Sequence, residues 1–522
     1  MNKMKYILLV ICLMVLTFSC EDAFDLQVKN KNQPTPDALS SQEGIIQAST
    51  GMYASGFYWR YWFEIQGFHE IMGDAIFIPW GNYGWRWANQ PTYIVLDDGT
   101  KVLPPQGGAQ GDELRKRNSR AYGWDNAFRA EWSLMYYANN QANLLLLGAD
   151  SDIAFTGNAE VKKKVIKAWA YYWKGLVYAR LGSIYSEGLI VDDYGVTNNN
   201  YVSNTSLIAE SNSNFDAAIQ ELSGISDDDT DYNSILASII PSYLQAKGLP
   251  TAGAWKRAMN TYKARNLLVN TKTDEMTSAN WNEILTLVND GIKSDDAVFV
   301  MTSDATFMED WVPAYVHYGW MFASERLVQD FKDGDARKAR GLSLKSAPTI
   351  NVRGRGIQYG TEWDFVDGGE WSTTSYETMY YAIGCSYEEN ELMLAEVKIN
   401  SGSIDEGLAH IDGVRALQKA ELADVANTGL DIDAAKEELR IERRIGLLFR
   451  GVAFYDARRW GVIDPIENGG GRTGCVVWDA QGNKHVNATF NYNYLPYWDV
   501  PADETDFNPK ENGDTASDLV KD

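Results

Sequence analysis

The sequence contains little cysteine and little histidine, and its basic residues are outnumbered by acidic ones. Four cysteines among 522 residues cannot form a disulfide-dense scaffold, so the fold has to depend on packing. Lysine and arginine number 47 against 71 aspartates and glutamates, which leaves a formal charge of −24. Nucleic acids and anionic lipid surfaces attract basic proteins, so neither is an expected partner of this acidic chain.

The motifs of common catalytic and cofactor chemistry are also missing. The pair His69-Glu70 lacks a second histidine four residues later, and no Gly-x-Ser-x-Gly or Gly-Lys-Ser/Thr sequence occurs. Gly354-x-Gly356 has its next glycine at Gly360, one residue too far for a dinucleotide turn. We therefore expect no catalytic residue, no metal site and no cofactor. A glycoside hydrolase needs only two carboxylates about 5–10 Å apart, so a secreted glycosidase stays open as an alternative.

The first twenty residues predict export and lipidation. Two lysines precede an uncharged apolar run of 13 residues, 6–18, which is followed by Ser19 and Cys20. This run is too short to cross a bilayer, and its order of basic, apolar and small residues is that of a signal peptide. We expect a signal peptide over residues 1–19, a lipid on Cys20 and a tether over residues 20–40. A secreted protein in which Cys20 is incidental is the alternative.

Helical periodicity dominates residues 41–522, which we expect to form one domain. Apolar side chains recur at helical spacing, most clearly over residues 159–181. In one predicted hairpin, small residues at Ala395 and Gly407 stand where two helices would cross, as in tetratricopeptide repeats. A generic helical bundle explains the stripes equally well. The predicted elements are hairpins at about 159–223, 254–292 and 388–420 and a helix at 433–460.

Three long segments show little periodicity and many aromatic residues. They cover residues 57–111, 299–381 and 463–506. Loops of this length in a compact chain are usually functional. The predicted fold is therefore mostly α, with helical hairpins as a scaffold and a long-loop, aromatic-rich face.

Several motifs together resemble one protein family. Near the C-terminus, Glu442-Arg443-Arg444 precedes Asp456 and Arg458-Arg459-Trp460-Gly461. Ser324-Glu325-Arg326-Leu327-Val328 with Asp333-Gly334-Asp335-Ala336-Arg337 forms a second motif, and Pro501-Ala502-Asp503-Glu504 with Asn508-Pro509 a third. In this order, behind a lipoprotein signal, they resemble the SusD/RagB family of outer-membrane nutrient-binding lipoproteins. The chain departs from the family at Gly446 and Arg450, usually glutamates, and at Ala453, often arginine. These three positions look like parts of one internal charge network.

The resemblance implies a SusD-like fold and a non-enzymatic protein at the cell surface, anchored in the outer membrane by its lipid alone. Such a protein binds an oligosaccharide or polysaccharide and delivers it to a SusC-like TonB-dependent transporter, over which it forms a lid. A peptide-binding, RagB-like member of the family is the main alternative. A tetratricopeptide adaptor or a secreted glycoside hydrolase fits less well.

Sugars bind where flat aromatic rings lie beside amide, carboxylate or guanidinium groups. Thirteen aromatic residues fall within residues 57–93, and a short Gly-containing stretch there combines indoles with polar side chains. The alternative is that Trp85 and Trp87 pack in the core. The resemblance adds weight to aromatics just before residue 324, and a third cluster surrounds Trp363, whose alternative is a loop packed on the transporter. The predicted ligand contacts are Asp74, Trp80, Asn82, Tyr83, Trp85, Arg86, Trp87, Trp311, Tyr315 and Trp363.

The two cysteines that would remain besides Cys20 after export are Cys385 and Cys475. Their spacing is compatible with a disulfide and equally with two separate buried thiols. The pairing therefore stays open at the level of sequence.

Overall fold

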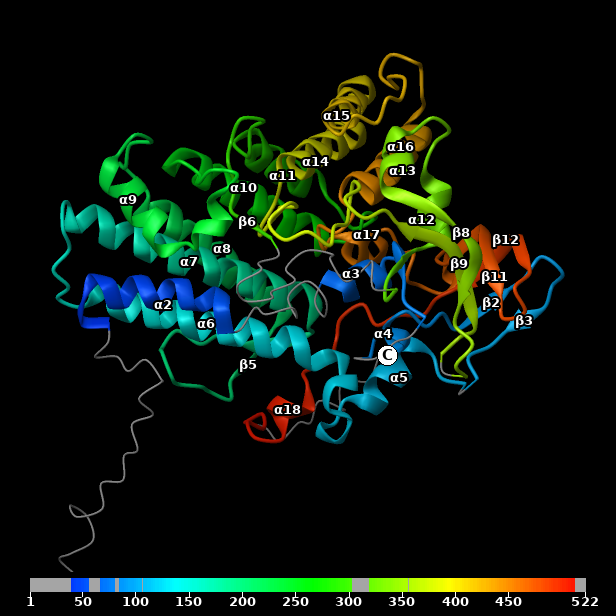
Figure 1. Cartoon of the computed structure of the whole chain (residues 1–522), viewed down its shortest axis with the longest axis horizontal. Helices are drawn as coiled ribbons and strands as arrows, with labels where there is room; N and C mark the ends of the chain where they lie inside the picture. The colour runs from blue at the N-terminus through cyan, green and yellow to red at the C-terminus, as the bar shows by residue number, and fades with distance from the viewer. Residues whose placement is uncertain are drawn as a thin grey trace, which may run out of the picture.

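The computed structural model describes residues 39–55, 66–79, 84–105, 107–302, 319–354 and 356–511. Figure 1 shows α2 and α6 to α11 on one side of the molecule and an antiparallel sheet on the other, with α12, α13, α16 and α17 beside the sheet. None of the helices in these ranges has both the length and the apolar character that crossing a membrane requires.

The helices are α2 (Gln42–Ser55), α3 (Gly67–Met72), α4 (Trp85–Ala88), α5 (Gln110–Arg117), α6 (Ala127–Asp150), α7 (Ala159–Ile184), α8 (Asn204–Glu221), α9 (Thr230–Ile239), α10 (Ala252–Val269), α11 (Ser278–Asn289), α12 (Glu325–Asp330), α13 (Ala336–Gly341), α14 (Tyr387–Asn400), α15 (Ile404–Leu417), α16 (Ile432–Gly446), α17 (Ala453–Arg459) and α18 (Ala502–Thr505). Short 3-10 turns are η3 (Arg120–Asp125), η4 (Ser242–Gln245) and η6 (Ile466–Asn468). The strands are β1 (Ile76–Phe77), β2 (Tyr93–Val95), β3 (Lys101–Val102), β4 (Glu187–Leu189), β5 (Tyr201–Ser203), β6 (Val300–Met301), β7 (Phe322–Ala323), β8 (Leu342–Ile350), β9 (Tyr359–Phe365), β10 (Tyr381–Ala382), β11 (Arg472–Asp479) and β12 (Lys484–Asn491).

The predicted helix at 159–181 is α7, and it forms the centre of the helical side. Its first turn is capped by Asn158, whose side-chain oxygen accepts hydrogen bonds from two backbone N–H groups. Trp169 and Tyr172 of α7 are buried against Trp255 and Phe299, with ring centroids 4.8 to 6.0 Å apart. Edge-to-face aromatic contacts of this kind add to the stabilisation from apolar burial. These aromatic residues therefore pack in the core.

The hairpin of α14 and α15 confirms the predicted crossing of small residues. A Cβ atom at Gly407 would lie 2.7 Å from the carbonyl oxygen of Ala395, closer than packed atoms can approach. Glycine is therefore required here for the two backbones to meet. Leu392, Leu408 and other apolar side chains of this hairpin form a small core with α16.

One helical prediction needs correction, and one helix has no counterpart among the expected elements. The helix expected over 433–460 is broken between α16 and α17, where Phe449 and Gly451 adopt positive φ angles of 61° and 70°. A helix cannot continue through left-handed residues. The second helix of the hairpin expected at 159–223 is α8, which begins at Asn204. Helix α6 was not predicted, because the buried Asn139 and Asn143 interrupt its apolar face. Their side-chain amides donate hydrogen bonds to the backbone oxygen of Val191, 2.7 and 2.9 Å away.

The three segments expected to be long loops instead contribute the strands of a six-stranded sheet. Its strand order is β3-β2-β12-β11-β9-β8, with every neighbouring pair antiparallel. The strands come from three separated parts of the chain, and two pairings contain register shifts. Short strands with bulges lack the regular alternation of buried and exposed side chains, so periodicity does not reveal them.

Most residues of the recognised C-terminal motif form buried ion pairs that join helices. Glu442 of α16 accepts hydrogen bonds from Arg337 and from Arg415 of α15, at 2.6 and 2.8 Å. Arg443 pairs with Asp456 of α17 at 2.9 Å. Removing one partner of a buried pair leaves an uncompensated charge, which is strongly destabilising. These ion pairs of the motif therefore stabilise the scaffold.

Cys385 and Cys475 are both buried and both free. Burial raises the pKa of each thiol, to about 11 for Cys475. The alternative of two separate buried thiols is therefore the correct one, and no disulfide between them contributes to the fold.

Candidate ligand-binding site

Asp74 does not have an oxygen free for a ligand. It follows α3, is 3% exposed, and its carboxylate accepts hydrogen bonds from Ser324 at 2.8 Å, from Arg326 at 2.8 and 2.9 Å and from Tyr492 at 3.1 Å. Burial raises the pKa of Asp74, but the positive charges of Arg326 and its neighbours outweigh burial and lower the pKa to about 2. The expectation that Asp74 binds a sugar hydroxyl is corrected: it joins α3, α12 and the segment after β12.

Trp85, Arg86 and Trp87 form most of the short helix α4 and are also buried. Their exposed fractions are 0%, 6% and 4%. The indole of Trp85 packs edge-on against Phe68 at a centroid distance of 6.4 Å, and the guanidinium of Arg117 lies 3.6 Å from the ring centre of Trp87. The expectation that these side chains present a binding surface is corrected in favour of packing. Residues i and i+2 of a helix do not share a face, so Trp85 and Trp87 pack against different partners.

Five other predicted contacts and the lipidation site lie outside the described residues. The contacts are Trp80, Asn82 and Tyr83 before α4, and Trp311 and Tyr315 before β7; the lipidation site is Cys20. Their roles stay predictions.

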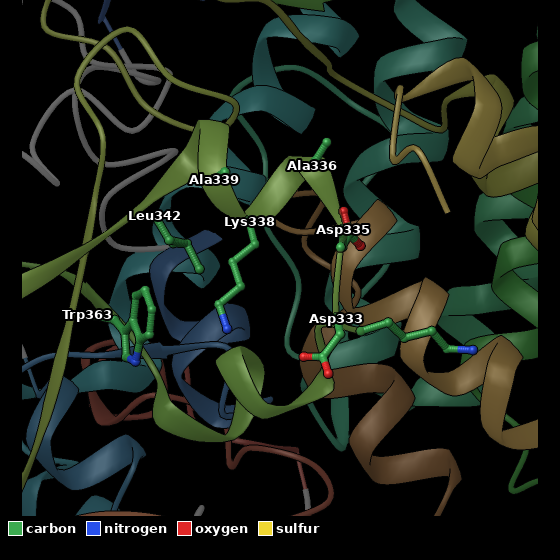
Figure 2. Close-up of a pocket in the computed structure, with 9 residues that line it drawn as sticks. Asp333, Asp335, Ala336, Lys338, Ala339, Leu342 and Trp363 are labelled. Atoms are coloured by element: carbon green, nitrogen blue, oxygen red, sulfur yellow. The ribbon is translucent and has the colours of Figure 1, made fainter. Parts of the chain in front are cut away.

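Among the predicted contacts that the structure describes, Trp363 lines an open cavity. It lies in β9, opposite Leu344 of β8, and is partly buried, with one side packed against the main core. The rest of the indole faces an open cavity of about 410 Å³. Figure 2 shows the side chains of Leu342, Lys338 and Trp363 gathered together, while the carboxylates of Asp333 and Asp335 lie apart from them. A cavity of this size can hold about one or two sugar rings.

The charged groups around this cavity differ in how strongly they are engaged. Asp335 pairs with Arg337 at 2.9 Å and caps α13, and Lys332 pairs with Glu438 of α16. Lys338 extends over the indole, with its nitrogen 4.8 Å from the ring centre of Trp363. Neither Lys338 nor Asp333 forms an ion pair with any described residue. The ammonium group of Lys338, beside the indole, and the carboxylate of Asp333, elsewhere on the cavity wall, are therefore free to bind hydroxyl groups.

The sequence interpretation missed Asp333 and Lys338 as site residues. Asp333 begins the motif Asp333-Gly334-Asp335-Ala336-Arg337 and Lys338 directly follows it. From sequence, this motif indicates only the family resemblance. Gly334 has a φ angle of 88°, so the chain turns sharply there and α13 begins two residues later. The turn brings α13 beside β9, a placement that depends on tertiary packing. Within the described ranges, no group of three histidine, cysteine or carboxylate side chains could hold a metal ion.

Comparison with solved structures identifies the fold. A SusD-like carbohydrate-binding protein from Bacteroides fragilis matches with a TM-score of 0.59 and 14% identity, over 91% of this chain and 99% of that one. A structure solved with a xylogluco-oligosaccharide matches with a TM-score of 0.57 and 14% identity, over 92% and 100% of the two chains. The B. fragilis protein NanU matches with a TM-score of 0.51 and 14% identity, over 82% and 92%. No protein-family model and no curated protein matches the chain. At these identities the likeness shows the fold, which is SusD-like, as the sequence motifs predict.

Proposed function

We propose, on the premise that this chain has the SusD-like fold, that it captures oligosaccharides at the cell surface and does not cleave them. The observation that carries this proposal is the open cavity beside Trp363, which is lined by an indole with an ammonium group over it and, at a separate place, by a carboxylate. Support comes from two solved structures of the same fold, one named a carbohydrate-binding protein and one containing a xylogluco-oligosaccharide.

The chemistry of the cavity suits a neutral sugar ring. The C–H face of a pyranose is apolar and packs against a flat indole, while its equatorial hydroxyls point outward to polar groups. Asp333 can accept hydrogen bonds from hydroxyls and Lys338 can donate to them. Because one side of Trp363 packs against the core, the ring is held in place before the ligand arrives.

The N-terminal sequence supports a position on the outer membrane. A lipid on Cys20 would bury acyl chains in a leaflet, each CH₂ group contributing about 0.8 kcal/mol. The chain would then deliver its ligand to a SusC-like TonB-dependent transporter, with Trp80, Asn82, Tyr83, Trp311 and Tyr315 as further proposed contacts. This partner and these contacts come from the family resemblance.

Binding to a panel of soluble polysaccharides and oligosaccharides, followed by tryptophan fluorescence and calorimetry, tests the proposal. Trp363→Ala should weaken binding about tenfold, a loss of about 1.4 kcal/mol. The matched control is Trp478→Ala. Trp478 is also a partly buried indole in the same sheet, and the nitrogen of Lys484 lies 5.5 Å from its ring centre, but it does not line the cavity. The control should bind as the wild type does.

Three results would contradict the proposal. The first is affinity for peptides with none for glycans, which would favour the peptide-binding alternative. The second is release of reducing ends from a bound polysaccharide, which would indicate a hydrolase. The third is equal binding by the wild type and Trp363→Ala, which would exclude this cavity as the site.

The anchor and the partner have separate tests. Cys20→Ser should move the protein out of the membrane fraction of its native host or of a bacterium that processes lipoproteins. Purification of the wild-type protein from solubilised outer membranes should recover a TonB-dependent barrel. A Cys20→Ser protein that stays in the membrane would contradict the proposed lipid anchor.

A further inference from the structure

A second cavity shares no lining residue with the cavity beside Trp363. Its volume is about 710 Å³, and it is bounded by the chain between α10 and α11, the end of α14, one face of α16 and the turn after α17. Trp460, the residue that follows α17, contributes a partly buried indole. The guanidinium groups of Arg459 and Arg440 lie 4.8 and 5.7 Å from the centre of this ring.

Four cationic side chains and two carboxylates line the cavity, and the cations differ in how strongly they are engaged. Arg459 is fully engaged by Glu396 and Asp456, at 2.5 and 2.8 Å. Lys272 pairs with Asp464 at 3.2 Å, and both line the cavity.

Two further cations line it from successive turns of α16. Lys436 forms no ion pair with any described residue, and the side chain of Arg440 is 44% exposed and reaches its nearest carboxylate, Glu437, only at 3.8 Å. The exposed carboxylate of Asp274 is the one unpaired negative group among the lining residues.

Lys436 and Arg440, which are unpaired and loosely paired, lie side by side on α16 in a chain with a formal charge of −24. The overall field of such a protein repels anions, and screening by salt confines the attraction of a small basic cluster to roughly 8–10 Å. An anionic ligand would therefore be held only where the basic groups contact it directly. Arginine and lysine bind carboxylates with charge-assisted hydrogen bonds, which are about twice as strong as neutral ones.

We propose that the cavity beside Trp460 is a second carbohydrate site, selective for a sugar residue that carries a carboxylate. The carboxylate binds Lys436 and Arg440 on α16, and the ring packs against the indole of Trp460. The amides of Asn400 and Asn468, which also line the cavity, bind the hydroxyls. The saccharide part of this inference rests on the proposed function, whereas selectivity for the acid rests on the charges described here.

Two pairs of probes separate the carboxylate from the rest of the sugar. Trigalacturonic acid is compared with its methyl ester, and 3′-sialyllactose with lactose, so that hexuronic and sialic acids are tested separately. We expect the wild-type protein to bind one acidic probe at least tenfold more tightly than its neutral counterpart. We also expect that preference to decline as the salt concentration rises.

The test variant is Lys436→Gln with Arg440→Gln, which removes both cations and leaves the fold intact because both side chains reach solvent. It should lose the preference for the acid. Its matched control is Lys164→Gln with Lys167→Gln on α7, which changes the net charge equally at two lysines that do not line the cavity. The control should keep the preference. Trp460→Ala should weaken the binding of acidic and neutral probes at this site to the same extent.

The outcomes distinguish this inference from the proposed function. Binding of neutral glycans that depends on Trp363, without any preference for an acidic probe, overturns the inference and leaves the proposed function standing. A preference for the acid that both double variants retain also overturns it, because the cluster on α16 would then play no part. Failure of every acidic and neutral glycan to bind overturns both proposals.

Discussion

Replacing Asp74 by asparagine distinguishes its structural role from the ligand-binding role that the sequence suggested. The substitution keeps the shape of the side chain and removes its charge. Asp74 has a φ angle of 56°, and asparagine tolerates this left-handed conformation as well as aspartate does, so the backbone adds no further strain. What changes is the pairing of the buried Arg326, whose nitrogens lie 2.8 and 2.9 Å from the carboxylate.

Two arguments set the size of the effect. The pKa of Asp74 falls from 3.8 to about 2 in the folded protein. At 1.36 kcal/mol for each pKa unit this corresponds to about 2 kcal/mol. Removing one partner of a buried ion pair commonly costs about 3–5 kcal/mol, because the other charge stays buried. We therefore expect Asp74→Asn to lower the free energy of unfolding by about 2–5 kcal/mol at neutral pH.

The pH dependence provides a second check of the same interaction. Because the pKa is depressed on folding, the stabilisation is complete above the unfolded value of 3.8 and is lost as the pH falls towards about 2. The difference between Asp74→Asn and the wild type should therefore shrink over this range.

Urea denaturation followed by tryptophan fluorescence, at neutral pH and at several acidic values, measures these differences. The control is Asp216→Asn, which breaks an ion pair with Lys263 in which the aspartate is 60% exposed. Exposed pairs contribute about 0–1 kcal/mol, so this variant should unfold almost as the wild type does. A stable Asp74→Asn protein that binds glycans more weakly would refute the structural role and restore the sequence interpretation.

Two further predictions concern Glu70 and the crossing of α14 with α15. Burial raises the pKa of Glu70 to about 8, although the backbone N–H of Gly451 donates a hydrogen bond to its carboxyl group. The wild type should therefore lose stability relative to Glu70→Gln as the pH rises from about 4.5 to about 8, by about 5 kcal/mol at most. Parallel pH dependences of the two unfolding curves would contradict this. Gly407→Ala should destabilise the protein by about 1–3 kcal/mol, because the new methyl group meets the backbone of Ala395. Gly413→Ala, in the same helix with open space around it, should be neutral or stabilising by up to about 1 kcal/mol in thermal unfolding, and equal losses in both variants would exclude the close approach as the cause.

The helical scaffold was predictable because helix formation is largely a local property. The spacing of apolar residues in α7, α10, α14 and α15 repeats with the period of a helix, and each of these elements begins and ends close to the predicted residues. The SusD-like fold followed from motifs whose order along the chain can be read directly.

The site was much less predictable, because burial is decided by contacts between distant segments. A tryptophan in a short aromatic stretch is equally suited to stacking on a sugar and to packing in a core. Trp85 and Trp87 are covered by residues such as Phe68 and Arg117, whereas Trp363 stays partly open because α13 leaves space beside it.

The sequence by itself determined the acidic character of the chain, the export signal it predicts, the helical hairpins and the family resemblance, because each depends on composition or on residues close in the chain. The tertiary structure alone decided the six-stranded sheet, the pairing of Asp74 with Arg326, 252 residues away, and the two cavities beside Trp363 and Trp460. The physical reason is that strand pairing, burial and ion pairing are contacts between segments far apart in the chain, and no local period records which segments will meet.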